Sequence, residues 1–119
     1  MKTVLWISRH EMTPTQRADL ERALQDSVCL DCWPDTVQSL SALTDRILQA
    51  DAVAAVLPMH LLAELVNMVP DKPVLQAISG RKPSGRTVTL ADGRQEQEFL
   101  FDHLYWERIL HAEFQTLRI

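Results

Sequence analysis

The sequence is poor in cysteine and has no long apolar run, and each scarcity excludes a class of protein. Two cysteines among 119 residues are too few for the disulfide framework of a small secreted domain. No apolar run approaches the roughly 20 residues that a membrane-spanning helix needs. The amino-terminal residues also lack the apolar stretch and small-residue cleavage site of a signal peptide. The sequence therefore predicts a cytoplasmic protein that does not enter the membrane.

Glycine is also scarce, with three residues in the whole chain. None of them lies in the segment Ser8–Gln16 (SRHEMTPTQ), which joins the first predicted strand to the first predicted helix. Neither G-x-G-x-x-G nor G-x-x-x-x-G-K-[ST] occurs there, which disfavours the dinucleotide and P-loop modes of nucleotide binding. The formal net charge of −4 argues against coating of nucleic acid. A local basic patch therefore stands out.

The chain is long enough for one domain, 1–119, with a single sizeable core. Apolar strand-like and helix-like segments alternate along its first 80 residues, which predicts βαβ units with right-handed crossovers. The predicted strands are 3–8, 27–33, 51–57 and 74–79. The predicted helices are 14–24, 37–49 and a third with an apolar stripe from Leu61 to Val69, closed by Pro70. The fold class is therefore α/β, an open Rossmann-like sheet with about four parallel strands and three helices.

The pattern changes after Gly80, so residues 81–119 are predicted to extend the 1–80 core. Arg81–Arg86 (RKPSGR) reads as a basic loop, and Ala91–Arg94 (ADGR) is a hairpin-type turn. Residues 99–110 fit either a long strand or a strand running into a helix. Residues 113–119 alternate weakly and predict a last edge strand. The extension is thus a C-terminal hairpin or strand addition.

Polar residues gather where ligands bind in open α/β sheets, beyond the carboxyl ends of the strands. If the strand order is 2-1-3-4, the loops after the first, third and fourth strands meet. The first helix would add free backbone N–H groups and a partial positive charge at its N-terminus. Together these features predict an anion site for a phosphate group. No cofactor and no metal are expected. The predicted ligand-binding residues are Ser8, Arg9, His10, Thr13, Gln16, Met59, Ser79, Gly80, Arg81, Lys82 and Arg86.

Within this set, His10, Arg9 and Arg81 are the catalytic candidates. A histidine with an ordinary pKa near 6.5 suits general acid–base work, and arginine offers a planar fork for phosphate oxygens. The alternative is that the basic loops are only solvated and that His10 orders its turn. Thr13 and Gln16 also fit a helix capping box around Pro14.

Two further features leave alternatives open. Cys29 and Cys32 form C-x-x-C, but in a strand they face opposite ways, so buried strand cysteines are expected over a redox or zinc pair. Near the C-terminus, Tyr105 and Trp106 with Arg108 are typical interface anchors. They could instead complete the core. A homodimer through edge strands would double any cationic site across a two-fold axis.

Two resemblances bear on function. The run Ser8–Gln16, followed by AVAAVLP and KPVLQAISGRKPSGRTV, resembles a family of small uncharacterised proteins encoded on bacterial mobile elements. The start S-x-H-x-(M/L)-T-x-x-Q and the basic segment after the fourth strand are similar to small CRISPR-associated ring nucleases. That similarity implies a CARF-like (CRISPR-associated Rossmann) fold. It also implies a homodimer that binds and linearises cyclic oligoadenylate.

The second resemblance implies a metal-independent phosphodiesterase whose matching residues are His10, Thr13, Gln16, Arg81 and Lys82. The sequence departs from the ring-nuclease pattern in carrying Arg9 before the histidine and a longer C-terminal hairpin. The first hypothesis is therefore a Rossmann-like protein that binds, and as a ring nuclease cleaves, an anionic nucleotide. The alternative is a non-enzymatic accessory or interaction protein of a mobile genetic element. A third is a redox or metal protein built on the two cysteines.

Overall fold

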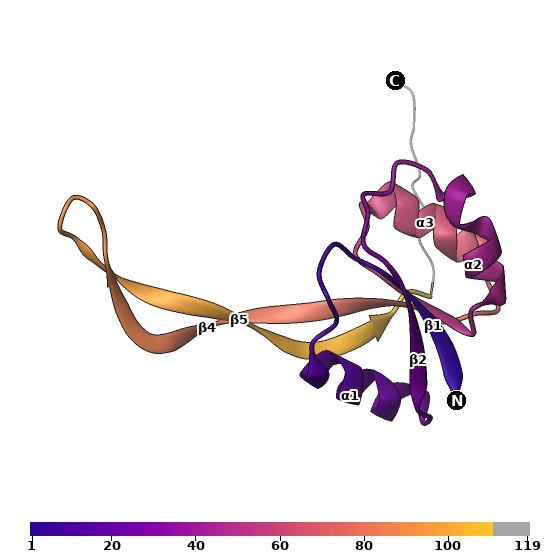
Figure 1. Ribbon diagram of the computed structural model, residues 1–119, viewed down its shortest axis with the longest axis horizontal. Helices are drawn as coiled ribbons and strands as arrows, with labels where there is room; N and C mark the ends of the chain where they lie inside the picture. The colour runs from indigo at the N-terminus through magenta and orange to yellow at the C-terminus, as the bar shows by residue number, and fades with distance from the viewer. Residues whose placement is uncertain (111–119) are drawn as a thin grey trace, which may run out of the picture.

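The computed structural model describes residues 1–110, except for the side chains of residues 82 and 99–101, and shows a five-stranded sheet with helices on both faces (Figure 1). The strands are β1 (Lys2–Ile7), β2 (Val28–Trp33), β3 (Ala52–Ala55), β4 (Val74–Thr89) and β5 (Gln95–Arg108). The helices are α1 (Pro14–Leu24), α2 (Thr44–Gln49), which follows a 3-10 turn at Leu40–Leu43, and α3 (Met59–Met68). The α/β class predicted from the sequence is confirmed.

The strand order is β2-β1-β3-β4-β5. Strands β1 to β4 run parallel, as the apolar runs in the sequence predict, and β5 returns antiparallel to β4. The expected 2-1-3-4 order is thus confirmed. Because the chain leaves β1 toward one edge and comes back past it to β3, the order reverses between β1 and β3. That reversal is where ligands bind in sheets of this kind.

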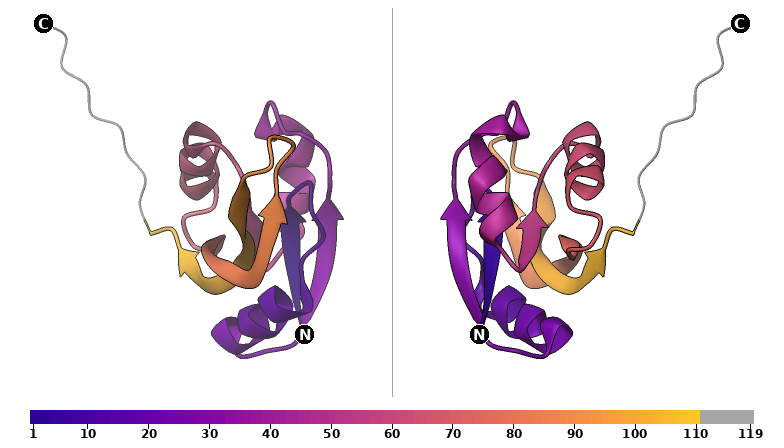
Figure 2. Two further views of the ribbon diagram at one scale, coloured as in Figure 1. Left: turned by 90° about the vertical axis from the view of Figure 1, so that its left-hand side faces the viewer. Right: turned by 90° about the vertical axis from the view of Figure 1, so that its right-hand side faces the viewer.

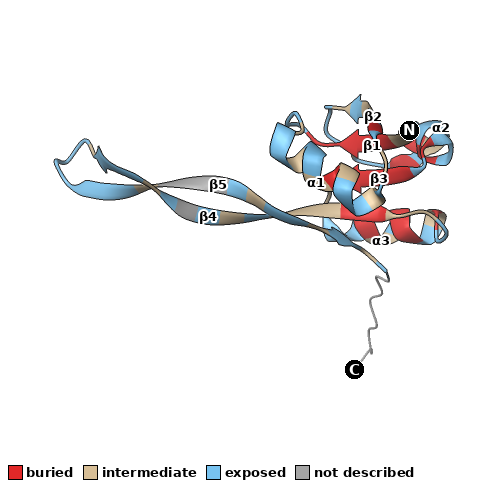
Figure 3. Ribbon diagram, turned by 90° about the horizontal axis from the view of Figure 1, so that it is seen from below, coloured by how far each residue is buried: buried red, intermediate tan, exposed pale blue. Residues whose placement is uncertain are grey.

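The sheet separates two apolar cores, and Figure 2 shows the helices that cover its two faces. On one face α1 packs Leu20 against Val4 and Trp6 of β1. On the other face α2 and α3 cover the sheet, with Ile47 and Leu65 fully buried. The buried segments concentrate in β1 and β3, the centre of the sheet (Figure 3). Among the described residues, no helix is long and apolar enough to cross a membrane.

The prediction of a loop at Arg81–Arg86 is wrong, because these residues continue β4. Only Val74 and Leu75 of β4 pair with β3, and from there the strand runs on beside β5 as a two-stranded ribbon. Figure 1 shows this ribbon projecting from the body of the domain, and residues 80–102 are called the arm below. Pro83 and Gly85 gave the loop signal. The ladder accommodates them with a register shift between Pro83 and Thr87 and a left-handed Gly85 (φ 84°).

The structure differs from the sequence-based predictions at the second helix and at the cysteines. The helix predicted over 37–49 is shorter, because Ser39 caps the 3-10 turn by accepting a hydrogen bond from the Ser41 N–H group (3.3 Å). The cysteines are free and exposed rather than buried. Their strand β2 lies at the sheet edge, and only Val28 in it is buried. The predicted strand over 113–119 lies outside the described residues.

Candidate functional site

The N-terminus of α1 carries the capping box that the sequence predicts. The Thr13 hydroxyl accepts the Gln16 N–H group at 3.1 Å, and the Gln16 side-chain oxygen accepts the Thr13 N–H group at 2.9 Å. Pro14, the first helical residue, has no N–H group to offer. The helix end therefore has fewer free donors for an anion than the sequence suggested, because the helix satisfies most of them itself.

The tight turn after β1 sends Arg9 and His10 to different places. Ser8 is 8% exposed, the only polar residue among the buried residues described, and its hydroxyl accepts the His10 N–H group at 3.1 Å. The indole N–H of Trp6 donates to the His10 carbonyl at 2.9 Å. These bonds hold the turn in one conformation, and the side chains of Arg9 and His10 line separate clefts.

The larger of these clefts, called the main cleft, has a volume of about 360 Å³, within the usual range of roughly 300–1,000 Å³ for small-molecule sites. It lies beside the turn after β1, between the start of α1 and the β4–β5 pair. Its lining residues are Trp6, Ser8, His10, Glu11, Thr13, Gln16, Val56, Ala77, Ser79 and His103. Five of the predicted ligand-binding residues, Ser8, His10, Thr13, Gln16 and Ser79, thus meet in one cleft.

A smaller cleft of about 160 Å³ lies on the other side of Ser8 and Val56, which line both. Arg9 lines this smaller cleft together with the end of β1 and the segments that follow β2 and β3. Asp35 shares the cleft with Arg9 and supplies the opposite charge. The turn after β1 therefore presents hydroxyl and imidazole groups on one side and a guanidinium on the other.

None of the remaining predicted residues whose side chains the structure describes lines either cleft. Gly80, Arg81, Lys82 and Arg86 follow Ser79 along β4 into the arm. Strand alternation puts Arg81 on the same face as Ser79, two residues further along, so Arg81 is the predicted cation nearest to the main cleft along β4. Met59 begins α3, is 67% exposed and lines neither cleft.

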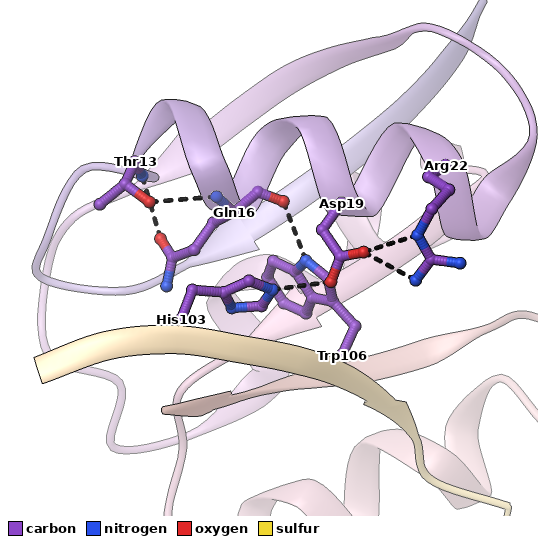
Figure 4. A network of polar contacts seen from close by, with 6 residues as sticks. All are labelled: Thr13, Gln16, Asp19, Arg22, His103 and Trp106. Carbon is purple, nitrogen blue, oxygen red and sulfur yellow. Dashed lines mark hydrogen bonds and ion pairs between the residues drawn. The ribbon is translucent and has the colours of Figure 1, made fainter. Parts of the chain in front are cut away.

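His103 is not among the predicted site residues, yet its side chain is only 4% exposed and lines the main cleft. Its Nε2 atom lies 2.8 Å from a carboxylate oxygen of Asp19 on α1, the contact drawn as a dashed line in Figure 4. Because a carboxylate only accepts, Nε2 carries the proton. Nδ1 is buried and has no partner among the described residues. No local sequence pattern marks this histidine as a site residue, because only the antiparallel return of β5 brings it to α1.

Asp19 is held from two sides. Besides His103, the Arg22 guanidinium donates to it, with Nε at 2.8 Å and a terminal nitrogen at 2.7 Å (Figure 4). The pKa of the Asp19 carboxyl lies below its ordinary value. The hydrogen bond from His103 is the largest cause, and the hydrogen bond from Arg22 is the next. Asp19 therefore stays ionised and holds the His103 ring in one tautomer.

Trp106 serves the core of the chain rather than an outside partner. Its indole N–H donates to the Gln16 carbonyl at 2.9 Å, and its ring meets Trp6 edge-on with 5.8 Å between centroids. It packs against the core on the α1 face. Of the two candidate roles for the C-terminal aromatics, the structure favours the core for Trp106. Tyr105, by contrast, is 46% exposed.

Metal binding finds no support in the described part of the chain, where no group of three or more His, Cys, Asp or Glu residues could hold an ion. Comparison with protein-family models, curated proteins and solved structures finds no match. Fold and site together define the class: an α/β domain with a polar cleft beside the reversal point of its sheet and a projecting antiparallel arm. What the cleft does must be argued from its residues.

Proposed function

We propose that the protein binds a small anionic ligand of the nucleotide type in the main cleft. One observation carries the proposal: five residues predicted from the sequence, from two segments far apart in the chain, line one cleft of ligand size beside the point where strand order reverses. Hydroxyl, amide and imidazole groups converge there over an apolar floor that includes Trp6 and Ala77. Such a lining suits a sugar and base.

The charges suggest how a nucleotide would lie. Glu11 is the one acidic residue in the lining of the main cleft, and it disfavours a phosphate at the centre. Arg9 flanks the cleft across Ser8, and Arg81 continues the face of Ser79. We therefore assign the sugar and base to the cleft and the phosphates to its rim, where arginine forks can bind them.

The activity we propose is that of a CARF-like ring nuclease acting on a cyclic oligoadenylate without metal. A ribose 2′-hydroxyl attacks the adjacent phosphorus and loses its proton to solvent water, the bond from phosphorus to the 5′-oxygen breaks, and that oxygen takes up a proton. The products are a 2′,3′-cyclic phosphate and a 5′-hydroxyl. His10 would protonate the leaving oxygen, while Arg9 and Arg81 stabilise the charge that develops on the phosphate.

The test is calorimetric titration of the protein with cyclic di-, tri-, tetra- and hexanucleotides, linear nucleotides and inorganic phosphate. We expect one cyclic oligonucleotide to bind, and the His10→Ala and Ser79→Ala variants to bind it about tenfold more weakly, a loss of about 1.4 kcal/mol. His60→Ala is the matched control, because His60 is an exposed histidine on α3 outside both clefts. Wild-type protein that binds none of these probes would contradict the proposal.

Cleavage is tested separately from binding. The bound cyclic nucleotide is incubated with protein in EDTA, and the products are separated by chromatography. We expect a linear product ending in a cyclic phosphate, formed more slowly by the Arg9→Ala and Arg81→Ala variants. Binding without any product would leave a ligand-binding protein and remove the nuclease activity.

A second candidate function is that of a non-enzymatic interaction protein, and the arm is the observation that favours it. The arm projects from the body of the domain (Figure 1), and only Arg81, at its base, is assigned to the binding site described above. A pull-down in which a partner is lost on changing the arm, but kept with His10→Ala, would favour this candidate over the first.

A further inference from the structure

The arm lacks the covering layer that stabilises other parts of the sheet. Of the described side chains between residues 81 and 97, only Ser84 and Leu90 are partly buried, and Val88 is 44% exposed (Figure 3). An isolated two-stranded ribbon is marginally stable in water at best. Further along the arm, β5 contains the sequence Phe99-Leu100-Phe101. The register of the ladder sets these residues opposite Pro83, Lys82 and Arg81. A partner surface for the arm is therefore expected on physical grounds.

The two strands of the arm carry opposite charges. The β4 side, residues 80–90, contains Arg81, Lys82 and Arg86 and no acidic residue. The β5 side, residues 95–102, contains Glu96, Glu98 and Asp102 and no basic residue. Two copies of such a surface, related by a two-fold axis, can therefore match the basic strand of one copy to the acidic strand of the other.

Contacts within one chain use only part of this charge. Arg94 pairs with Asp92 in the turn at 2.6 Å, and the Ser84 hydroxyl donates to Glu98 at 3.0 Å. In the part of the chain that the structure describes, neither Arg86 nor Glu96 has an ion pair, and both are exposed. These two side chains, one from each strand, are available to a second molecule.

We propose that the arm binds the arm of a second copy of this chain. A two-fold axis parallel to the ribbons, between their facing surfaces, lays β4 of one copy over β5 of the other, so that each basic strand meets an acidic one. Val88 and its counterpart lie in the same contact. Pro83 and the basic residues of β4 disfavour addition of a strand at its edge. Pairing of two β5 edges would bring the carboxylates of both copies together, so the ribbons meet through their faces.

The charges also decide against a nucleic acid as occupant. A two-stranded ribbon can enter a DNA groove, but it needs positive charge along the strands that approach the phosphates. Here the β5 side would bring three carboxylates to the phosphates. The proposed pairing of arms needs no ligand in the main cleft, so it stands or falls independently of the proposed function.

The experiment measures molar mass by light scattering during size-exclusion chromatography of the wild-type chain and two charge variants. We expect wild-type protein at twice the 13.6 kDa of one chain. Arg86→Glu makes the β4 side less basic, and Glu96→Arg makes the β5 side less acidic, so each variant alone should shift strongly toward monomer. An equimolar mixture should regain the dimer, because the altered strands of the two variants then attract each other.

The mixture separates pairing of arms from damage to the fold, since two damaged chains would not rescue each other. Glu64→Arg is the control, an equal charge reversal at an exposed position of α3, and should remain dimeric. Wild-type protein that runs as a monomer across micromolar concentrations would overturn the proposal. So would a mixture that stays as monomeric as its components.

Discussion

At the scale of single residues, the most informative group is the pair formed by His103 and Asp19. Their hydrogen bond joins β5 to α1 across 84 positions of sequence, and beside it Trp106 bonds to Gln16 between the same two elements. Both bonds fasten the base of the arm to the helix whose start lines the main cleft. The geometry of the cleft therefore depends on residues that lie far from it in the chain.

Asp19→Asn should destabilise the protein at neutral pH and hardly at all in acid. The folded-state pKa of Asp19 is lowered, so its contribution is fully present above the ordinary carboxyl pKa of about 3.9 and is lost as pH falls through the folded value. We expect a loss of about 1–2 kcal/mol at neutral pH, since a charge-assisted bond is removed. Urea unfolding of both proteins across pH measures the difference.

The control for this series is Asp71→Asn, an exposed aspartate outside the network. It should follow the wild-type pH profile. A deficit in Asp19→Asn that stays constant down to strongly acidic pH would mean that lost packing, and not the charge of Asp19, is responsible.

Thr13→Ala should cost about 1 kcal/mol of unfolding free energy, the usual value of a lost N-cap. The hydroxyl that accepts the Gln16 N–H group is removed, whereas Thr13→Ser keeps it and should be nearly neutral. Chemical denaturation gives both values. If Thr13→Ala unfolds like the serine variant, the capping box does not stabilise α1.

At the scale of elements, β4 shows how tertiary pairing overrides local signals. Proline and glycine at 83 and 85 break a strand when read alone, yet the ladder to β5 carries β4 through them with a register shift. Residues 99–110 fit both a strand and a helix when their sequence is taken alone, because periodicity does not show whether a partner strand lies beside them. The pairing with β4 decides for a long strand.

Removing the arm should leave the domain folded. Replacement of residues 83–99 by Asn-Gly keeps the pairs Ser79–His103 and Ala77–Trp106, and Asn-Gly suits a two-residue hairpin turn. We expect the far-ultraviolet circular dichroism spectrum to show that the rest of the domain keeps its secondary structure. We also expect the shortened protein to be a monomer in solution. Loss of the cooperative unfolding transition would show instead that the arm is required for the core.

At the scale of the whole molecule, association and ligand binding both act on apparent stability by mass action. If the arms pair, the wild-type midpoint of thermal unfolding should rise with protein concentration. That of Arg86→Glu should stay constant over the same range. Scanning calorimetry at several concentrations measures both, and a wild-type midpoint that does not move argues for a monomer.

A ligand of the main cleft should stabilise the wild-type chain by about 2.7 kcal/mol at a concentration one hundred times its dissociation constant. The same ligand should shift the His60→Ala variant equally and the His10→Ala variant much less. Thermal-shift measurements with cyclic and linear nucleotides report these shifts. Equal shifts in all three proteins would place the binding site elsewhere.

The sequence by itself determined the parallel core and half of the site. Apolar runs predict β1, β2 and β3, the last two followed by proline, and the capping box predicts the start of α1. The residues after β1 lie beside the reversal point as predicted. These signals are local, so the sequence alone carries them. Tertiary structure alone decided the separation of Arg9 from His10, the exposure of the cysteines at an edge, the arm, and the arrival of His103 at α1. Each of these depends on which strand lies next to which, and sequence periodicity does not carry that information.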